Sequence, residues 1–163
     1  MSSDPECLGK RVGAPGPEVG TLVGQNALMA APRTRLSGPT VDSNDPRSLA
    51  RFYETLLGWK LVACEPARPG LPPEDGWARI ESPSGEQKIE FQWTPDYVAP
   101  VWPPASGRQQ MMIHLDIAAE DLEAAVAWAV DAGATVAAHQ PQEGVRVMID
   151  PAGHPFCLFQ GEV

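Results

Sequence analysis

The sequence predicts an α+β fold built from two similar modules, each with the order strand, helix, strand, strand, strand. A strand followed by a capped helix occurs twice, over residues 40–58 and again over residues 111–133. The helix ends also correspond, because Leu57-Gly58-Trp59 closes the first copy and Ala132-Gly133-Ala134 closes the second. Apolar runs typical of strands follow both helices. Two copies of about 60 residues are too few for a solenoid, so we expect two half-sheets that close on one shared cleft.

The first module is expected over residues 34–95. Its helix begins after Asp45, whose side chain can cap the backbone, and Pro46 suits the first helical position. Apolar residues recur at helical spacing up to Gly58, which favours the left-handed conformation that ends a helix. The strands expected here are Leu36–Ser43, Trp59–Cys64, Trp77–Glu81 and Lys88–Trp93, of which the last two form a hairpin.

A long connection, Thr94–Gln110, separates the two modules and contains four prolines. Its length is typical of a linker rather than a tight turn. The second module is expected over residues 110–162, with a helix near residues 120–132 that ends at Gly133. Its strands are expected at Met111–Ile117, Thr135–His139, Val145–Ile149 and Pro155–Gln160, and the last two are joined by the turn Asp150-Pro151-Ala152-Gly153.

Residues 1–33 lack the periodicity of a helix or a strand. The segment Gly13–Pro17 is too rich in glycine and proline for the interior of either element. We therefore expect a disordered N-terminal tail, followed by one folded domain over residues 34–163.

The composition argues against several classes of partner. The formal net charge is −9 and the pI is near 4.7, whereas nucleic acids and anionic membranes are bound by basic patches. No apolar run reaches the roughly 18 residues of a membrane span, and Met1–Lys10 lacks the apolar stretch of a secretory signal. Three cysteines, an odd number without a Cys-x-x-Cys motif, are typical of a reducing compartment. We expect a cytoplasmic protein.

The strand expected at Met111–Ile117 has two different faces. Side chains alternate along a strand, so Met112, His114 and Asp116 share one face. The other face is apolar throughout, with Met111, Ile113, Leu115 and Ile117. The apolar face suits the core, and the polar face suits the wall of a cleft.

Several segments, taken in order, resemble one known family. They are Asp45-Pro46 through Leu57-Gly58-Trp59, then His114-Leu115-Asp116, then Gly133-Ala134-Thr135-Val136, and finally Asp150-Pro151-Ala152-Gly153 through Leu158. Together they resemble the vicinal oxygen chelate superfamily, in its glyoxalase and bleomycin-resistance-like group. The resemblance implies paired βαβββ modules, a curved mixed sheet that forms a cup with the helices outside, and in many members a homodimer.

The resemblance also raises the question of a metal. Metal-using members place one ligand on each of four strands, and carried over by position these fall on Gly38 or Thr40, on Glu90, on His114 and on Cys157. Gly38 has no ligand atom, the hydroxyl of Thr40 is weak, and a thiol among apolar side chains resists losing its proton. Glu90, His114 and Cys157 are three possible donors, yet we expect no bound metal and no cofactor.

Strand alternation and the resemblance together give a predicted site. We expect His114 and Glu90 to do acid–base chemistry, with His114 paired to Glu90 or Asp116. The alternative is that His114 and Asp116 only satisfy each other. His139 and His154 are expected at the surface. The other residues predicted to contact a ligand are Thr40, Asp42, Gln92, Trp102, Met112, Asp116, Cys157 and Phe159.

The sequence supports three hypotheses for function. The first is a metal-independent, glyoxalase-like enzyme of isomerase, lyase or cyclase type that acts on a small organic molecule in the cup. The second is a binding protein that sequesters a cationic antibiotic, which the acidic charge and Trp102 favour. The third is a metal-dependent lyase or dioxygenase that uses Glu90 and His114. In each case we expect a homodimer that binds neither nucleic acid nor membrane.

Overall fold

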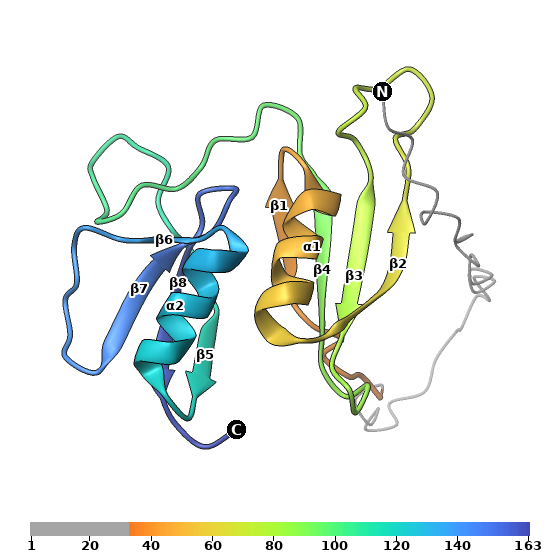
Figure 1. Ribbon diagram of the computed structural model, residues 1–163. Coiled ribbons are helices and arrows are strands. Elements are labelled where there is room, and N and C mark those ends of the chain that lie inside the picture. The colour runs from red at the N-terminus through yellow and green to blue at the C-terminus, as the bar shows by residue number, and fades with distance from the viewer. Residues whose placement is uncertain (1–32) are drawn as a thin grey trace, which may run out of the picture.

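The computed structural model describes residues 33–163, so the tail expected over residues 1–33 lies, except for its last residue, outside the described part of the chain. The first module contains β1 (Thr40–Ser43), α1 (Pro46–Leu57), β2 (Lys60–Glu65), β3 (Trp77–Glu81) and β4 (Lys88–Trp93). The second contains β5 (Asp116–Ala119), α2 (Leu122–Ala132), β6 (Thr135–Val136), β7 (Val145–Ile149) and β8 (Pro155–Gln160). The α+β fold of two βαβββ modules is confirmed (Figure 1).

Each module forms one four-stranded mixed sheet, and the two sheets have the same topology. The strand orders are β1-β4-β3-β2 and β5-β8-β7-β6. The first strand of each module runs parallel to the last, and the other neighbours are antiparallel. In the first sheet Thr40 lies opposite Glu90 and Asp42 opposite Gln92, whereas in the second sheet Asp116 lies opposite Cys157. The repeat in the sequence is therefore a repeat in three dimensions.

The two helices begin and end by the same physical devices. The Asp45 carboxylate accepts a hydrogen bond of 3.1 Å from a backbone N–H of α1, and Asp121 does the same for α2 at 3.0 Å. Gly58 and Gly133 follow the helices with φ of 64° and 118°, in the left-handed region. Neither of these helices has the length and apolar character needed to cross a membrane.

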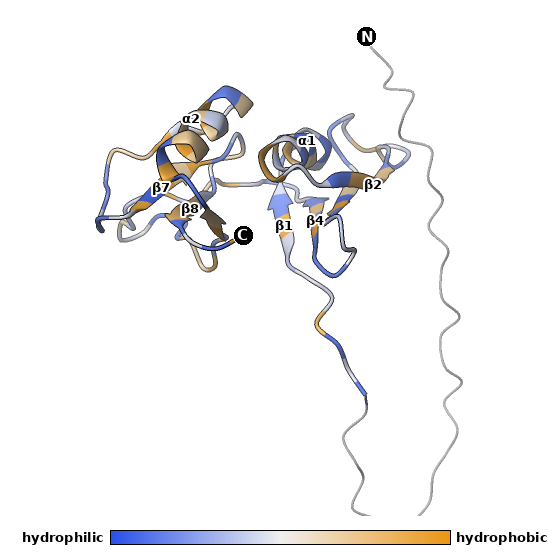
Figure 2. Ribbon diagram, turned by 60° about the horizontal axis from the view of Figure 1, so that its bottom comes forward, coloured by the Kyte–Doolittle hydropathy of each residue, from blue (hydrophilic) through white to orange (hydrophobic). Residues whose placement is uncertain are grey.

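One apolar core joins the modules. Phe156 on β8 lies with its ring centroid 6.1 Å from both Phe52 and Tyr53 on α1, and Tyr53 stacks on Phe91 at 5.5 Å. These side chains are buried in a continuous cluster that also includes residues of α2. Figure 2 shows both helices on the same side of their sheets. The opposite face of each sheet is free of helix, and it carries the polar residues predicted for the cup.

The strand expected at Met111–Ile117 is shorter than predicted, because β5 begins only at Asp116. The carbonyl of Leu115 accepts a hydrogen bond of 2.9 Å from Cys157, which is where pairing with β8 starts. Residues 111–114 lie before that pairing and run between the modules. Ile113, expected in the core, is 82% exposed, so the prediction of an apolar buried face was wrong at this position. Met112, predicted for the other face and for the wall of the cleft, is 87% exposed.

Two other strands are also shorter than predicted. β1 begins at Thr40 rather than Leu36, and Leu36 is 91% exposed. β6 ends at Val136, where the backbone of Ala137 still donates to Val147 but the next residues leave the sheet. In both cases the strand-like pattern in the sequence extends beyond the residues that pair with a neighbouring strand.

The linker between the modules packs against the turn that precedes β8. A Cβ atom on Gly153 would lie 2.6 Å from the Cβ of Ala99, and the φ of Gly153 is 95°, so only glycine fits this turn. The indole of Trp102 donates a hydrogen bond of 2.9 Å to the carbonyl of His139. Tyr97 also reaches the turn through its hydroxyl, 3.0 Å from the carbonyl of Ala152. These contacts therefore hold the linker in a defined position against the second module.

Candidate functional site

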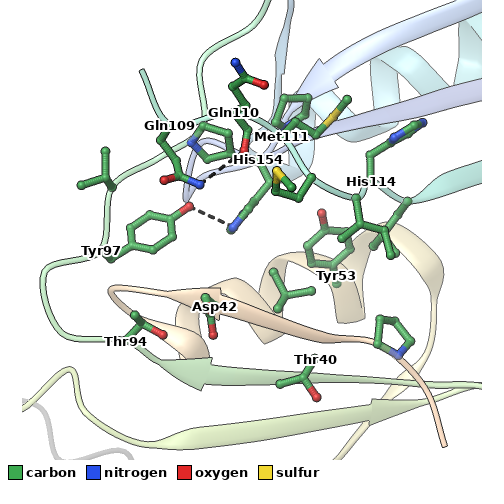
Figure 3. Close-up of a pocket in the computed structure, with 18 of the residues that line it drawn as sticks. Thr40, Asp42, Tyr53, Thr94, Tyr97, Gln109, Gln110, Met111, His114 and His154 are labelled. Atoms are coloured by element: carbon green, nitrogen blue, oxygen red, sulfur yellow. Dashed lines mark hydrogen bonds between the residues drawn. The ribbon is translucent and has the colours of Figure 1, made fainter. Parts of the chain in front are cut away.

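A first cavity of about 420 Å³ lies between the two modules. β1 supplies Thr40 and Asp42 to one wall, and the end of the linker supplies Met112 and His114 to another. Figure 3 shows Tyr97 and His154 at the same cavity, facing the side chains of β1. Four of the ten residues predicted from the sequence therefore line this cavity, namely Thr40, Asp42, Met112 and His114.

A second cavity of about 400 Å³ lies on the helix-free face of the second sheet. Its lining brings together five predicted residues, Trp102, His114, Asp116, Cys157 and Phe159. Trp102 comes from the linker, whereas Cys157 and Phe159 alternate along β8, as strand geometry requires. His114 lines both cavities, so the two meet at this histidine.

Two predicted residues, Glu90 and Gln92, are absent from the lining of both cavities. Glu90 instead binds its neighbours on the first sheet, since Lys88 Nζ lies 3.0 Å and Arg79 lies 3.9 Å from its carboxylate. Gln92 donates a hydrogen bond of 2.7 Å to Asp42 on β1. The structure therefore leaves Glu90 in an ion-pair cluster of the first sheet and places His114 with the second sheet.

Asp116, and not Glu90, is the carboxylate beside His114. Its Oδ1 atom lies 3.1 Å from His114 Nε2. Burial raises the pKa of the Cys157 thiol, and the negative charge of Asp116 and a hydrogen bond to Asp116 raise it further. The three side chains form a compact group, because their potential ligand atoms all lie within 4.8 Å of one another.

This group fits a divalent metal poorly. His114 and Asp116 are ready donors, but the thiol of Cys157 must lose its proton before it binds a metal, and its raised pKa opposes that loss. The Asp116 side chain is 63% exposed, so water competes for its oxygens. The remaining carried-over ligand, Glu90, is held by Lys88 and Arg79. With two ready donors, this group falls short of the three or four protein ligands of a stable zinc or iron site, and no other such group occurs among residues 33–163.

The turn before β8 carries functional groups that sequence reasoning missed. His154, expected at the surface, has a side chain that is only 21% exposed, and it lines the first cavity. Its Nδ1 atom lies 2.9 Å from the buried carboxylate of Asp150. Its Nε2 atom lies 2.9 Å from the hydroxyl of Tyr97 (Figure 3). The four-residue spacing between Asp150 and His154 was the signal in the sequence, because a turn of this length can bring the two side chains into contact.

Tyr53 and Tyr97, the two tyrosines near Asp150, both stay protonated. Burial raises the pKa of Tyr53 well above its ordinary value, and the charge and hydrogen bond of Asp150 raise it further. Burial also raises the pKa of Tyr97, followed by the charges of Asp150 and Asp42. Each hydroxyl is therefore neutral at physiological pH and donates a hydrogen bond.

Comparison with known sequences and structures assigns the fold. Residues 39–159 match the family model described as a glyoxalase-like domain. A glyoxalase family protein from Enterococcus faecalis is 20% identical, with a TM-score of 0.55 over 77% of this chain and 97% of that chain. The fosfomycin resistance protein FosX from Mesorhizobium loti is 14% identical, with a TM-score of 0.52 over 79% of this chain and 93% of that chain.

A third similar structure is a glyoxalase/bleomycin resistance protein/dioxygenase family enzyme from Burkholderia phytofirmans PsJN. It is 14% identical, with a TM-score of 0.51 over 76% of this chain and 96% of that chain. None of the proteins of curated function matches the chain. At these identities the structural likeness concerns the fold alone, while the family match spans most of the chain. The chain belongs to the glyoxalase-like domain family of the vicinal oxygen chelate superfamily.

Proposed function

We propose that the protein binds a small organic molecule in the two cavities that meet at His114 and transforms it by acid–base chemistry without a metal. The observation that carries the proposal is the position of His114, which lines both cavities and has the Asp116 carboxylate 3.1 Å from its Nε2 atom. Ligand sites are commonly concave, largely apolar and furnished with a few convergent polar groups, and both cavities have this character.

The pair of His114 and Asp116 can act as a general base. When Nε2–H donates to Asp116, the proton of the neutral imidazole lies on Nε2, and Nδ1 is left as the basic nitrogen. Nδ1 takes a proton from a carbon or oxygen of the ligand, and the electron pair of the broken bond moves to a neighbouring carbonyl or expels a leaving group. The carboxylate of Asp116 stabilises the imidazolium that results. Isomerase, lyase and cyclase reactions all use this step.

We further propose that Glu90 acts in a homodimer. The helix-free face of the first sheet carries Thr40, Asp42, Glu90 and Gln92, which resemble half of a cup. The helix-free face of the second sheet carries Cys157 and Phe159, with His114 beside them. Two copies related by a twofold axis would place the first sheet of one against the second sheet of the other. Closed twofold dimers are the commonest soluble assembly, which supports this arrangement.

The acid–base function is tested with 5-nitrobenzisoxazole, a general probe for protein bases. A base removes its C–H proton, the N–O bond breaks, and a coloured cyanophenolate forms. We expect His114→Gln to lower kcat by about 100-fold, since general-base catalysis contributes at least that much. His139→Gln is the matched control, because its ring lies outside both linings. Equal rates for His114→Gln and the unaltered protein would contradict the proposal.

A non-catalytic binding function is the second candidate, and one observation favours it. The second cavity contains Trp102 and Asp116 but no lysine or arginine. An aromatic face and a carboxylate together suit a cationic ligand. Titration with bleomycin, followed by tryptophan fluorescence, and the rate with 5-nitrobenzisoxazole together separate the two functions. A binding protein binds bleomycin, loses affinity for it in Trp102→Ala and does not accelerate the probe, whereas an enzyme accelerates the probe and loses that turnover in His114→Gln.

A further inference from the structure

A buried carboxylate organises the wall of the first cavity. Asp150 is 4% exposed and accepts hydrogen bonds of 2.9 Å from the backbone N–H groups of Ala152 and His154. The hydroxyl of Tyr53 donates to its Oδ2 atom at 3.0 Å. A carboxylate surrounded by donors acts as an acceptor only, so the contact with His154 Nδ1 at 2.9 Å requires a proton on Nδ1. Asp150 therefore fixes the tautomer of His154 and leaves Nε2 as its basic nitrogen.

The basic nitrogen of His154 is directed at Tyr97. The Tyr97 hydroxyl lies 2.9 Å from Nε2 and 3.0 Å from the carbonyl of Ala152. The hydroxyl has one proton, so it donates to only one of these two acceptors at a time. When His154 is neutral, Tyr97 donates to Nε2. When His154 is protonated, Nε2–H donates to the hydroxyl oxygen, and the proton of Tyr97 turns to Ala152. Both protonation states are thus fully hydrogen-bonded.

This chain of groups ends at the cavity. Tyr97 and His154 both belong to the lining of the first cavity, and they come from different parts of the chain, the linker and the turn before β8. Figure 3 shows the Tyr97 hydroxyl directed at the ring of His154, with both side chains on the side of the cavity that faces Asp42. The other titratable groups that line this cavity are Asp42 on β1, Tyr53 on α1, Asp96 on the linker and His114 before β5.

We infer that Tyr97, His154 and Asp150 form a proton relay that serves a ligand in the first cavity, opposite His114. The ligand gives a proton to the oxygen of Tyr97 while the hydroxyl proton of Tyr97 moves to Nε2 of His154. The electron pair of the broken bond stays on the ligand, and the imidazolium is held by the Asp150 carboxylate. The reverse transfer returns the proton. Tyr97 touches the ligand, and Asp150 is a positioning residue.

The inference rests on the proposed function for its ligand, but it adds a second acid–base group. One cavity then holds two independent groups, His114 and the relay. Such a pair removes a proton from one atom and delivers a proton to another, which an isomerisation or an elimination requires. The relay also gives a reason for a buried carboxylate and an ordered histidine in a turn that is otherwise made of proline, alanine and glycine.

The relay is tested first without any ligand. The chain has three histidines, so ¹⁵N NMR of the imidazoles resolves each of them through a pH titration. We expect neutral His154 to carry its proton on Nδ1, and Asp150→Asn to move that proton to Nε2. Tyr97→Phe should change the ¹⁵N resonance of Nε2 in neutral His154, because that nitrogen loses its hydrogen-bond donor, while the resonances of His139, the internal control, stay unchanged. A neutral His154 protonated on Nε2, or an Nε2 resonance insensitive to Tyr97→Phe, would overturn the relay.

The second arm uses 5-nitrobenzisoxazole and separates the relay from the proposed role of His114. We expect His154→Gln to lower kcat by about 100-fold and to remove one limb of the pH–rate profile, whereas His139→Gln changes neither. A rate lost in His114→Gln and kept in His154→Gln overturns the relay and retains the proposed function. The opposite pattern retains the relay and overturns the role of His114. If the unaltered protein does not accelerate the probe, the acid–base function fails, and the NMR titration alone decides the relay.

Discussion

The hydroxyl of Tyr53 lies 3.0 Å from the carboxylate of Asp150, 97 positions further along the chain, and both side chains are buried. Tyr53 belongs to α1 of the first module, and Asp150 precedes the last strand of the second. This single hydrogen bond therefore links the modules at the centre of their common core. The ring of Tyr53 adds to the link, because two of its aromatic neighbours, Phe91 and Phe156, come one from each module.

Replacing Tyr53 by Phe removes that hydroxyl and leaves the rest of the ring in place. A hydrogen bond to a charged group contributes about 2 kcal/mol, and the buried carboxylate loses one of its donors, so we expect the free energy of unfolding to fall by about 2 kcal/mol. Urea unfolding followed by circular dichroism measures the change. Thr55→Val serves as a control, since the Thr55 hydroxyl is exposed and bonds only within α1. A loss no larger than that of the control would show that the link contributes little.

The buried carboxylate of Asp75 should make the free energy of unfolding depend on pH. This carboxylate accepts from the backbone and the guanidinium of Arg68, and these hydrogen bonds hold its pKa below the ordinary value, with a smaller contribution from the charge of Arg47. A carboxyl group with a lowered pKa in the folded state stabilises the fold above the ordinary range near pH 4. This stabilisation is lost as the pH falls through the lowered value.

Asp75→Asn should therefore be less stable than the unaltered protein at pH 7, and the difference should shrink towards pH 2. Thermal unfolding at a series of pH values measures it. Glu143→Gln is the control, because Glu143 is exposed and lies in the loop before β7. A difference that stays constant with pH would mean that the charge of Asp75 is not the source of its effect.

The Cys157 thiol should react slowly with alkylating reagents at pH 8. Burial raises its pKa most, and Asp116 raises it further, so little thiolate is present. Asp116→Asn removes the negative charge, lowers the thiol pKa and should speed alkylation by iodoacetamide severalfold. Peptide mass spectrometry at Cys157 measures the rate. The control is Glu123→Gln, which also removes one negative charge but at an exposed position of α2. An unchanged rate would show that Asp116 has no electrostatic influence on the thiol.

The purified protein should contain no stoichiometric zinc, iron, nickel or manganese. The physical reason is the number of ready donors, since in the one candidate group that the described residues form, His114 and Asp116 alone bind a metal without first losing a thiol proton. Elemental analysis of the protein after purification without chelators measures the content. One metal per chain that disappears in both His114→Ala and Cys157→Ser would contradict this prediction and favour a metal-dependent lyase or dioxygenase.

The protein should be a homodimer in solution, with twice the 17.5 kDa mass of one chain. Met112 and Ile113 are 87% and 82% exposed in the single chain, beside the first cavity, and large apolar side chains so exposed favour an interface. Light scattering at micromolar concentration measures the mass. Met112→Glu should shift the protein towards the monomer. The control, Val62→Glu, changes a side chain that is 45% exposed on β2 and should leave the mass unchanged. A 17.5 kDa species in the unaltered protein would contradict the dimer.

The elements predicted best are those whose signals are local. α1 has a capping aspartate, a proline at its first position and a terminal glycine, and β3 and β4 form a hairpin around a turn, so their bounds follow from neighbouring residues. Met111–Ile117 was predicted less well, because alternation of side chains does not reveal where a partner strand begins. The partner of this strand is β8, about 40 residues further along the chain, and it pairs only from Asp116 onwards.

In the candidate site, too, the positions that follow from local pattern were predicted, and those that depend on distant residues were missed. Alternation along β8 correctly put Cys157 and Phe159 on one face, where Trp102 and Asp116 join them. His154 escaped prediction because one of its two side-chain partners, Tyr97, comes from the distant linker, and only Asp150 lies in the same turn. Only the folded chain brings Tyr97 to within 2.9 Å of a histidine 57 positions away.

More than half of the residues around the first cavity belong to the segment 94–115, and only a few belong to the sheets. The parts of the chain that decide what fits in the cavity are therefore separate from the parts that keep the molecule folded. A change of sequence or length in this segment can alter the shape of the cavity while both four-stranded sheets persist. Exchanging segment 94–115 between relatives is thus a direct way to give this scaffold a new ligand.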